Sequence, residues 1–219
     1  MNDMQFLTWV RGPGLNIAIA IFLVGVVWRL VEIYSLGRKK DLSAPRHAAG
    51  ASGFHTIFRR SLPPPGMVKR SPVSYIGGYI FHVGLAIVVF LFAPHIKLFE
   101  SLIGIAWPAL PSQVVDMAAV ITLAAMVVVL ADRINKPVKR FLSTFEDYFT
   151  WTVTFLPVLT GYLAVKHLLL PYTTMLALHV LSVEILLVIL PFTKLFHAFT
   201  LFGSRWYNGH ANAHKGVPV

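Results

Sequence analysis

The stretch TMLALHVLSVEILLVILPFTKLFHAFT, residues 174–200, decides the architecture of this chain. It is almost entirely apolar and long enough to cross the ~30 Å hydrocarbon core of a bilayer as one helix. Within it His179 and His197 lie eighteen residues apart. Eighteen residues make five helical turns, so the two imidazoles would share one face about 27 Å apart. A second apolar segment, 73–99, carries His82 and His95.

The composition is that of a membrane protein. Of 219 residues, 56% are hydrophobic and 13% are charged, and the mean hydropathy is +0.69, whereas a soluble domain carries about a quarter charged residues. Apolar windows of about twenty residues recur. We therefore expect one all-α integral membrane bundle over residues 1–219, with a polar loop at 37–72, a polar tail at 203–219 and five transmembrane helices at 15–36, 73–99, 111–134, 148–170 and 174–200.

The net charge of +10 comes largely from alternate loops. The opposite loops carry little charge, so the positive-inside rule predicts that the N-terminus lies outside and the C-terminus is cytoplasmic. This orientation explains the charge without nucleic acid, although the segment 37–70 could also dock a cytoplasmic partner or anionic lipid. We expect a multi-pass protein of a bacterial or archaeal cytoplasmic membrane. The basic residues between the first two helices are Arg38, Lys39, Lys40, Arg46, Arg59, Arg60, Lys69 and Arg70.

The chain contains no cysteine. This excludes disulfides, Cys-ligated iron–sulfur clusters and covalently attached c-type haem. Any redox cofactor must therefore be non-covalent and held by histidine. Its electrons must leave to another polypeptide or to a diffusible carrier.

The expected topology places the intramembrane histidines at two depths. His82 would lie level with His197 near the cytoplasmic side, and His95 level with His179 near the outer side. Two histidines can hold a b-type haem iron axially, and ionisable residues inside a membrane usually indicate function. We expect an inner and an outer b-type haem, with Gly84 leaving room for the inner macrocycle. The alternative is that the histidines only hydrogen-bond between helices.

The fourth ligand is the least determined. His95 lies thirteen residues after His82 and directly follows Pro94, which could kink the helix or mark its end. His95 could instead be an interfacial residue near a quinone. His167 is then the substitute ligand for the outer haem.

Other polar residues of the spans have two interpretations each. Arg29 and Lys194 could pair with a haem propionate, since a guanidinium suits a carboxylate, or they could snorkel or pair within the chain. Glu184 could pass a quinol proton or hydrogen-bond to a neighbouring helix. The expected outer surface also carries donors for a quinone head group, namely Lys97, Lys166 and His167.

Several motifs resemble one family over almost the whole chain. They are Phe81-His82-Val83-Gly84, Leu178-His179, Pro191-Phe192-Thr193-Lys194-Leu195-Phe196-His197, Phe22-Leu23-Val24-Gly25 with Arg29, and Arg133 with Pro137-Val138-Lys139-Arg140. Together they resemble the gamma subunit of respiratory nitrate reductases, a five-helix di-haem cytochrome b. One difference is that the family's spacing of ten would put the second helix-two histidine at Phe92. The wider superfamily includes membrane subunits of heterodisulfide-reductase-like and dissimilatory sulfur complexes.

The resemblance implies a respiratory-chain subunit with no catalytic centre of its own beyond a quinone site. Quinol oxidation near the outer haem would send electrons inward to a cytoplasmic iron–sulfur subunit. Two alternatives stay open. One is a quinone-reducing subunit of a heterodisulfide-reductase-like or sulfur-metabolising complex, and the other is a haem-free membrane anchor.

Overall fold

The computed structural model describes residues 2–37, 42, 44, 46 and 49–217, and these form helices and connecting turns. Five segments are long and apolar enough to cross a membrane: Asp3–Ser35, Val73–Leu91, Ser112–Asn135, Phe145–Val165 and Tyr172–Phe192. The predicted all-α membrane bundle with five spans is therefore confirmed. The elements are α1 (Asp3–Trp9), η1 (Val10–Gly14), α2 (Leu15–Ser35), α3 (Ala49–Arg59), α4 (Met67–Arg70), η2 (Val73–Gly77), α5 (Gly78–Leu91), α6 (Ala93–Ile103), α7 (Ser112–Asn135), α8 (Pro137–Leu142), α9 (Phe145–Val165), α10 (Tyr172–Ile189), η3 (Leu190–Phe192), η4 (Lys194–Phe196) and α11 (His197–His214).

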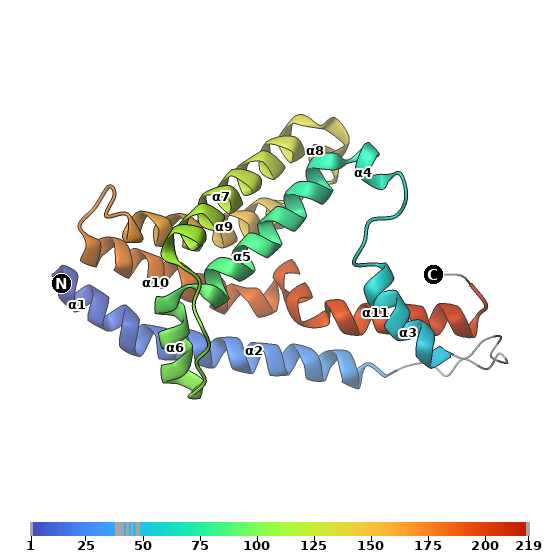
Figure 1. The fold of residues 1–219 in the computed structure, drawn as a ribbon. Helices are drawn as coiled ribbons and strands as arrows, with labels where there is room; N and C mark the ends of the chain where they lie inside the picture. Colours follow the sequence, from blue (N-terminus) through green and yellow to red (C-terminus); the bar gives the residue numbers. More distant parts are fainter. Residues whose placement is uncertain (1, 38–41, 43, 45, 47–48, 218–219) are drawn as a thin grey trace.

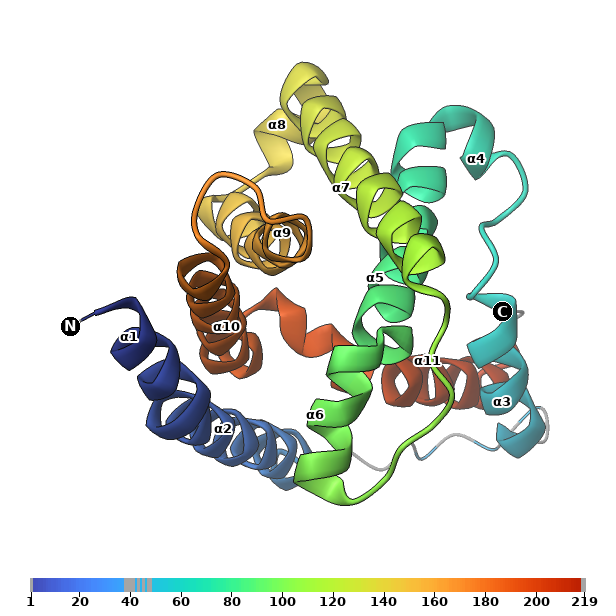
Figure 2. The ribbon, with the colours of Figure 1, turned by 60° about the vertical axis from the view of Figure 1, so that its left-hand side comes forward.

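The spans form a curved row. Helix α5 packs against α7, α7 against α9, α9 against α10, and α10 against α2, as Figure 2 shows. Figure 1 places α4, α8 and α11 at the end of the molecule away from the N-terminus. Helix α4 carries Lys69 and Arg70, and α8 carries Lys139 and Arg140, so these basic residues and the C-terminal helix lie toward one end.

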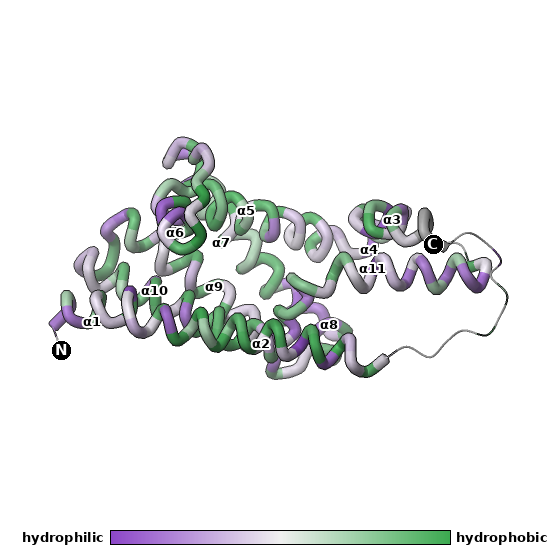
Figure 3. Tube along the Cα trace, turned by 90° about the horizontal axis from the view of Figure 1, so that it is seen from below, coloured by the Kyte–Doolittle hydropathy of each residue, from purple (hydrophilic) through white to green (hydrophobic). Residues whose placement is uncertain are grey.

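Apolar side chains cover the outside of the spans. Val24 and Trp28 of α2 are both 69% exposed, and Figure 3 shows hydrophobic residues along the long helices with more polar ones on α11. Small residues such as Ala18, Ala119 and Ala177 are buried between helices. This is the pattern of a membrane bundle, in which lipid solvates the outer faces and small residues allow close helix packing.

The first span is longer at its N-terminal end than the predicted 15–36. Helix α1, the π-helical turn η1 and α2 continue from one to the next over Asp3–Ser35. Asn2 and Gln5 close a capping box at the start. Pro13 lies inside η1, where a residue without a backbone N–H is accommodated by a locally wider helix.

The second predicted helix, 73–99, is broken in two. Helix α5 ends at Leu91, Phe92 is extended with φ −86° and ψ 126°, and α6 begins at Ala93. Pro94 lies in the first turn of α6, where its missing N–H does no harm, whereas inside a continuous helix it would clash with the preceding turn. His95 therefore belongs to a separate helix.

The fifth predicted helix, 174–200, is also broken, and its expected single-helix geometry is wrong. Helix α10 ends at Ile189, Pro191 lies in the 3-10 turn η3, and Thr193 is extended with φ −127°. His197 is the first residue of α11. Hence His179 and His197 do not share the face of one helix.

The polar segments contain helices of their own. Helix α3 lies in the loop 37–72, and α11 extends through most of the tail to His214. The two pack together, and Arg205 of α11 donates a hydrogen bond to Ser61 Oγ at 2.7 Å. The expected basic residues Arg38, Lys39 and Lys40 lie outside the described residues.

Candidate functional site

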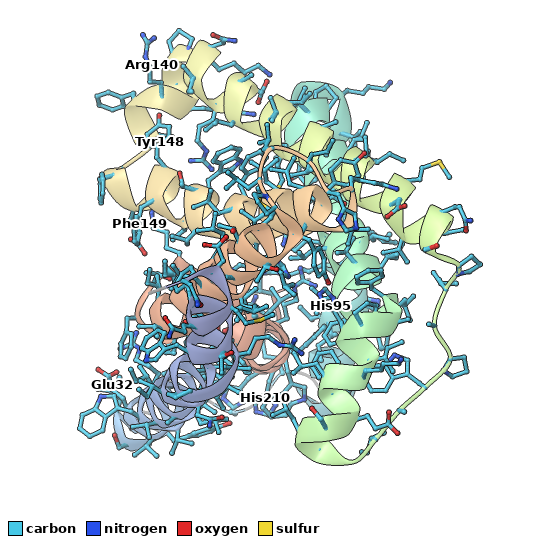
Figure 4. The ribbon with its side chains drawn as sticks, turned by 90° about the vertical axis from the view of Figure 1, so that its left-hand side faces the viewer. Glu32, His95, Arg140, Tyr148, Phe149 and His210 are labelled. Atoms are coloured by element: carbon cyan, nitrogen blue, oxygen red, sulfur yellow. The ribbon has the colours of Figure 1, made fainter. Side chains whose placement is uncertain are left out.

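The four histidines predicted as haem ligands meet in two pairs, an inner pair (His82, His197) and an outer pair (His95, His179). His82 and His179 lie within the five spans, whereas His95 and His197 lie on the helices that follow the breaks. The ring centroids of His82 on α5 and His197 on α11 are 6.2 Å apart, with the ring planes at 73°. Those of His95 on α6 and His179 on α10 are 6.1 Å apart, with the planes at 20°. Figure 4 shows His95 toward the middle of the helices, while Glu32 and Arg140 lie at the periphery. The pairs are those that the expected topology had put level with each other.

Every one of these rings is oriented through its Nδ1 atom. His82 Nδ1 contacts the carbonyl oxygen of Gly78 at 2.7 Å and His197 Nδ1 that of Lys194 at 2.7 Å. His95 Nδ1 contacts the carbonyl of Val88 at 2.8 Å, and His179 Nδ1 that of Pro157 at 3.0 Å.

A carbonyl can only accept, so each Nδ1 carries the proton and donates it. Each Nε2 then holds a lone pair, and among the described residues none of these four Nε2 atoms makes a hydrogen bond. A backbone carbonyl on one ring nitrogen is the usual support for a histidine whose other nitrogen binds a metal.

The break at Phe92 brings His95 next to His179. The last carbonyls of a helix have no partner within it, and here side chains and the following loop use them. Val88 accepts from His95, Phe90 accepts from the Trp107 indole N–H at 2.5 Å, and Leu91 accepts from the Leu110 N–H at 3.0 Å. The helix end thus aims His95 at His179.

The two pairs differ in their surroundings. His95 and His179 are half-buried, whereas His82 and His197 are exposed within the chain. Burial lowers the pKa of His95, so its neutral form is favoured. On the other side of the outer pair, Gly161 lies against His179: a Cβ at this position would be 2.9 Å from His179 Cε1. A side chain at residue 161 would displace the ring.

Ion pairs position the segment before His197. Lys194 Nζ lies 3.0 Å from an Asp147 oxygen, and the Lys194 backbone N–H donates to Glu146 Oε1 at 2.8 Å. Asp147 also accepts from the backbone N–H of Thr144 at 2.8 Å, which completes a capping box at the start of α9. The N-terminus of α9 therefore fixes the turn whose carbonyl orients His197.

The structure gives local partners to the other predicted cofactor-binding residues. Lys194 is paired as described above. Arg29 pairs with Glu32, and its guanidinium carbon lies 5.9 Å from the Phe196 ring centroid, while its buried Nε has no partner among the described residues. Gly84 packs against α7, since a Cβ there would be 1.9 Å from Thr122 Oγ1. Close helix packing alone is thus sufficient reason for this glycine.

The predicted quinone-binding residues are dispersed. Lys97 is exposed on α6, and Lys166 forms an ion pair with Asp116 at 2.5 Å, which raises the pKa of Lys166. His167 stacks on Tyr172 with centroids 5.0 Å apart, and it is His95 whose ring faces His179. No hydrogen bond among the described residues joins the three.

Sequence reasoning missed the residues that support the histidines. The Thr144-x-x-Asp147 spacing is a readable capping signal, yet the approach of this helix start to Lys194 is a tertiary contact. The carbonyl of Val88 and the fit of Gly84 to Thr122 likewise depend on how the helices pack. Within the described residues, no group of three or more His, Cys, Asp or Glu side chains could hold a metal ion by itself, so the histidines come as pairs.

The fold and its two histidine pairs define a multi-pass, all-α membrane protein. The chain is 32% identical over 202 residues to a protein of Nitratidesulfovibrio vulgaris strain Hildenborough, covering 90% of this chain and 89% of that one. It belongs to the same family as this relative, whose name states no activity. No family model and no solved structure matches the chain.

Proposed function

We propose that the chain is a di-haem cytochrome b subunit. It exchanges electrons between the quinone pool and a cytoplasmic iron–sulfur or catalytic subunit. The observation that carries this proposal is the pair of facing histidines at each of two sites, with every Nδ1 bound to a carbonyl. The absence of cysteine is consistent with cofactors held by histidine alone.

The histidine separations fit a metal bound between two imidazoles. A metal–imidazole nitrogen bond is about 2.0 Å, and the nitrogen lies about 1.1 Å from its own ring centroid, so a linear pair would have centroids about 6.2 Å apart. The observed values are 6.2 and 6.1 Å. His82 and His197 would hold the inner haem, and His95 and His179 the outer haem. A bound haem supplies a one-electron redox centre.

The surrounding chain would orient these ligands and compensate cofactor charge. Arg29 is the candidate for a propionate of the inner haem, because it lies beside Phe196 and keeps a buried Nε without a partner among the described residues. Lys194 holds the turn before His197 through Asp147. The basic end of the bundle would face the cytoplasm and receive the partner subunit.

The direction of electron flow is a separate question. Quinol oxidation with delivery to the cytoplasmic subunit is the leading form, as in nitrate reductases. Quinone reduction by a sulfur-metabolising partner would use the same four histidines, because haem potentials depend on hydrogen bonding and burial around the iron. Quinol oxidation at the outer side conserves energy, because electrons move inward against the membrane potential, about 2.3 kcal/mol per charge at 100 mV. Electron flow in the opposite direction through the same two sites would consume that energy.

A redox-titrated visible spectrum, with haem counted per polypeptide, tests the proposal. We expect two b-type haems in the purified chain, one haem in His95→Ala or His179→Ala, and two in the matched control His167→Ala. Two haems surviving in His95→Ala would assign the outer ligand elsewhere. A colourless wild-type protein with no bound haem would reject the cytochrome and favour the membrane anchor.

A further inference from the structure

A groove on the lipid-facing side of the bundle lies between the first span and α10. Its volume is about 270 Å³, and its lining comprises Trp9, Gly14, Ile17, Ala18, Leu181, Glu184, Ile185, Val188 and Ile189. Glu184 is the sole charged residue among these. Ile17 is 56% exposed and Ile185 is 42% exposed, so the groove opens toward the surrounding lipid.

Glu184 is an unsatisfied polar group at this position. The residue is only 6% exposed, and its buried Oε1 makes no hydrogen bond with any described residue. An unpaired carboxyl group inside a bilayer costs a few kcal/mol. A ligand that hydrogen-bonds to it would therefore gain more here than at a surface.

The π-helical turn makes room for this carboxyl group. Gly14 ends η1, and a Cβ at Gly14 would be 2.9 Å from Glu184 Oε1 and 3.1 Å from the Trp9 ring. Single π-helical turns inside α-helices often occur at functional sites. Glu184 can therefore enter the groove because residue 14 has no side chain.

We propose that this groove binds the head group of a membrane-soluble quinol, whose hydroxyl donates a hydrogen bond to Glu184. The groove is apolar apart from that carboxyl group, which suits a ring with few polar atoms. Its volume lies just below the usual range of small-molecule sites, about 300–1,000 Å³, so it would hold a head group rather than a whole quinol. The isoprenoid tail remains in the lipid. An anionic phospholipid head group is disfavoured, because its phosphate would approach a carboxylate.

The same residue suits both redox forms of the ligand. An ionised carboxylate accepts a hydrogen bond from a quinol hydroxyl, and a protonated one donates to a quinone carbonyl. Helix α10 carries His179 on one side and Glu184 five residues later, about 140° around and about 7.5 Å along the axis. The inference rests on the proposed function, since the quinone pool is the redox partner there, and it moves the quinone from Lys97, Lys166 and His167 to this groove.

The test measures binding of 2-heptyl-4-hydroxyquinoline N-oxide, a fluorescent quinol analogue, to the full chain in lipid nanodiscs. Haem per polypeptide is counted in the same samples. Glu184→Leu should weaken binding about ten- to hundred-fold, since a hydrogen bond to a charged group is lost. Gly14→Ala should also weaken binding. Gly12→Ala is the matched control, because a Cβ at Gly12 meets nothing within 4 Å.

The outcomes separate this inference from the proposed function. Weaker binding in Glu184→Leu and Gly14→Ala, with wild-type haem content and a normal Gly12→Ala, supports the groove. Unchanged binding in Glu184→Leu, or no binding by the wild-type chain, would reject quinol binding in the groove. If the same samples contain two haems, the proposed cytochrome function is retained. Glu184-dependent binding by a chain without haem would support the groove and reject the cytochrome.

Discussion

At the scale of single residues, the chain uses backbone carbonyls to set histidine tautomers. His82 and His197 use a carbonyl four or three residues earlier, whereas His95 and His179 use carbonyls of another helix or helix segment. The carbonyl contacts leave Nε2 of all four residues as the atom that would coordinate the proposed haem iron. Orientation therefore comes from the fold rather than from neighbouring acidic side chains.

Asp147 supports the inner pair through its ion pair with Lys194. Asp147→Asn removes the charge that pairs with Lys194 while keeping an oxygen that can cap α9. Because the Lys194 side chain is half exposed, we expect a loss of at most about 1 kcal/mol in the free energy of unfolding. Thermal unfolding of the purified chain in detergent measures this loss. The spectrum of the inner haem should change as well.

A matched control for Asp147 lies on the other side of the bundle. Asp116→Asn breaks the exposed ion pair with Lys166, and an exposed pair is worth at most about 1 kcal/mol. We expect it to leave the inner haem spectrum unaltered. Equal effects of the two substitutions on that spectrum would show that Asp147 does not position His197.

At the scale of elements, Gly84 allows α5 to approach α7 closely. Gly84→Ala would place a Cβ 1.9 Å from Thr122 Oγ1, and Thr122 is fully buried. Overpacking of this kind costs about 1–3 kcal/mol. The melting temperature should fall in Gly84→Ala and recover in part when Thr122→Ala removes the nearest atom.

Gly78→Ala provides the comparison within the same helix. A Cβ at Gly78 meets nothing within 4 Å, so this substitution should be neutral or stabilise the helix by up to about 1 kcal/mol. If Gly84→Ala were as stable as Gly78→Ala, the contact between the two helices would be looser than described.

Element by element, the sequence predicted where the spans lie better than where they stop. Apolar windows of twenty residues locate all five spans, because the bilayer demands that length. Hydropathy continues through Phe92 and Pro191, however, so the two breaks are invisible to it. The break at Pro94 is readable from its proline only as a possible end, and the extended Thr193 depends on the contact of Lys194 with α9.

At the scale of the whole molecule, the proposed cytoplasmic partner subunit requires that the basic end of the bundle faces the cytoplasm. The chain has no cysteine, which allows single cysteines to report sidedness. We expect Ser112→Cys, at the start of α7, to react with a membrane-impermeant maleimide in intact cells. Ser204→Cys, exposed on α11, should react only after permeabilisation, and the reverse labelling would place the basic end outside.

The broken second span has a consequence for recognising related proteins. Because His95 sits on its own helix beyond an extended residue, its distance along the chain from His82 is not tied to the helical repeat of α5. Insertions or deletions near the junction can shift the ligand's number without disturbing its place opposite His179. A sequence pattern with one fixed number of residues between these two histidines would miss chains with such insertions or deletions. A pattern that allows a variable number, and requires a tryptophan after α6, would find them.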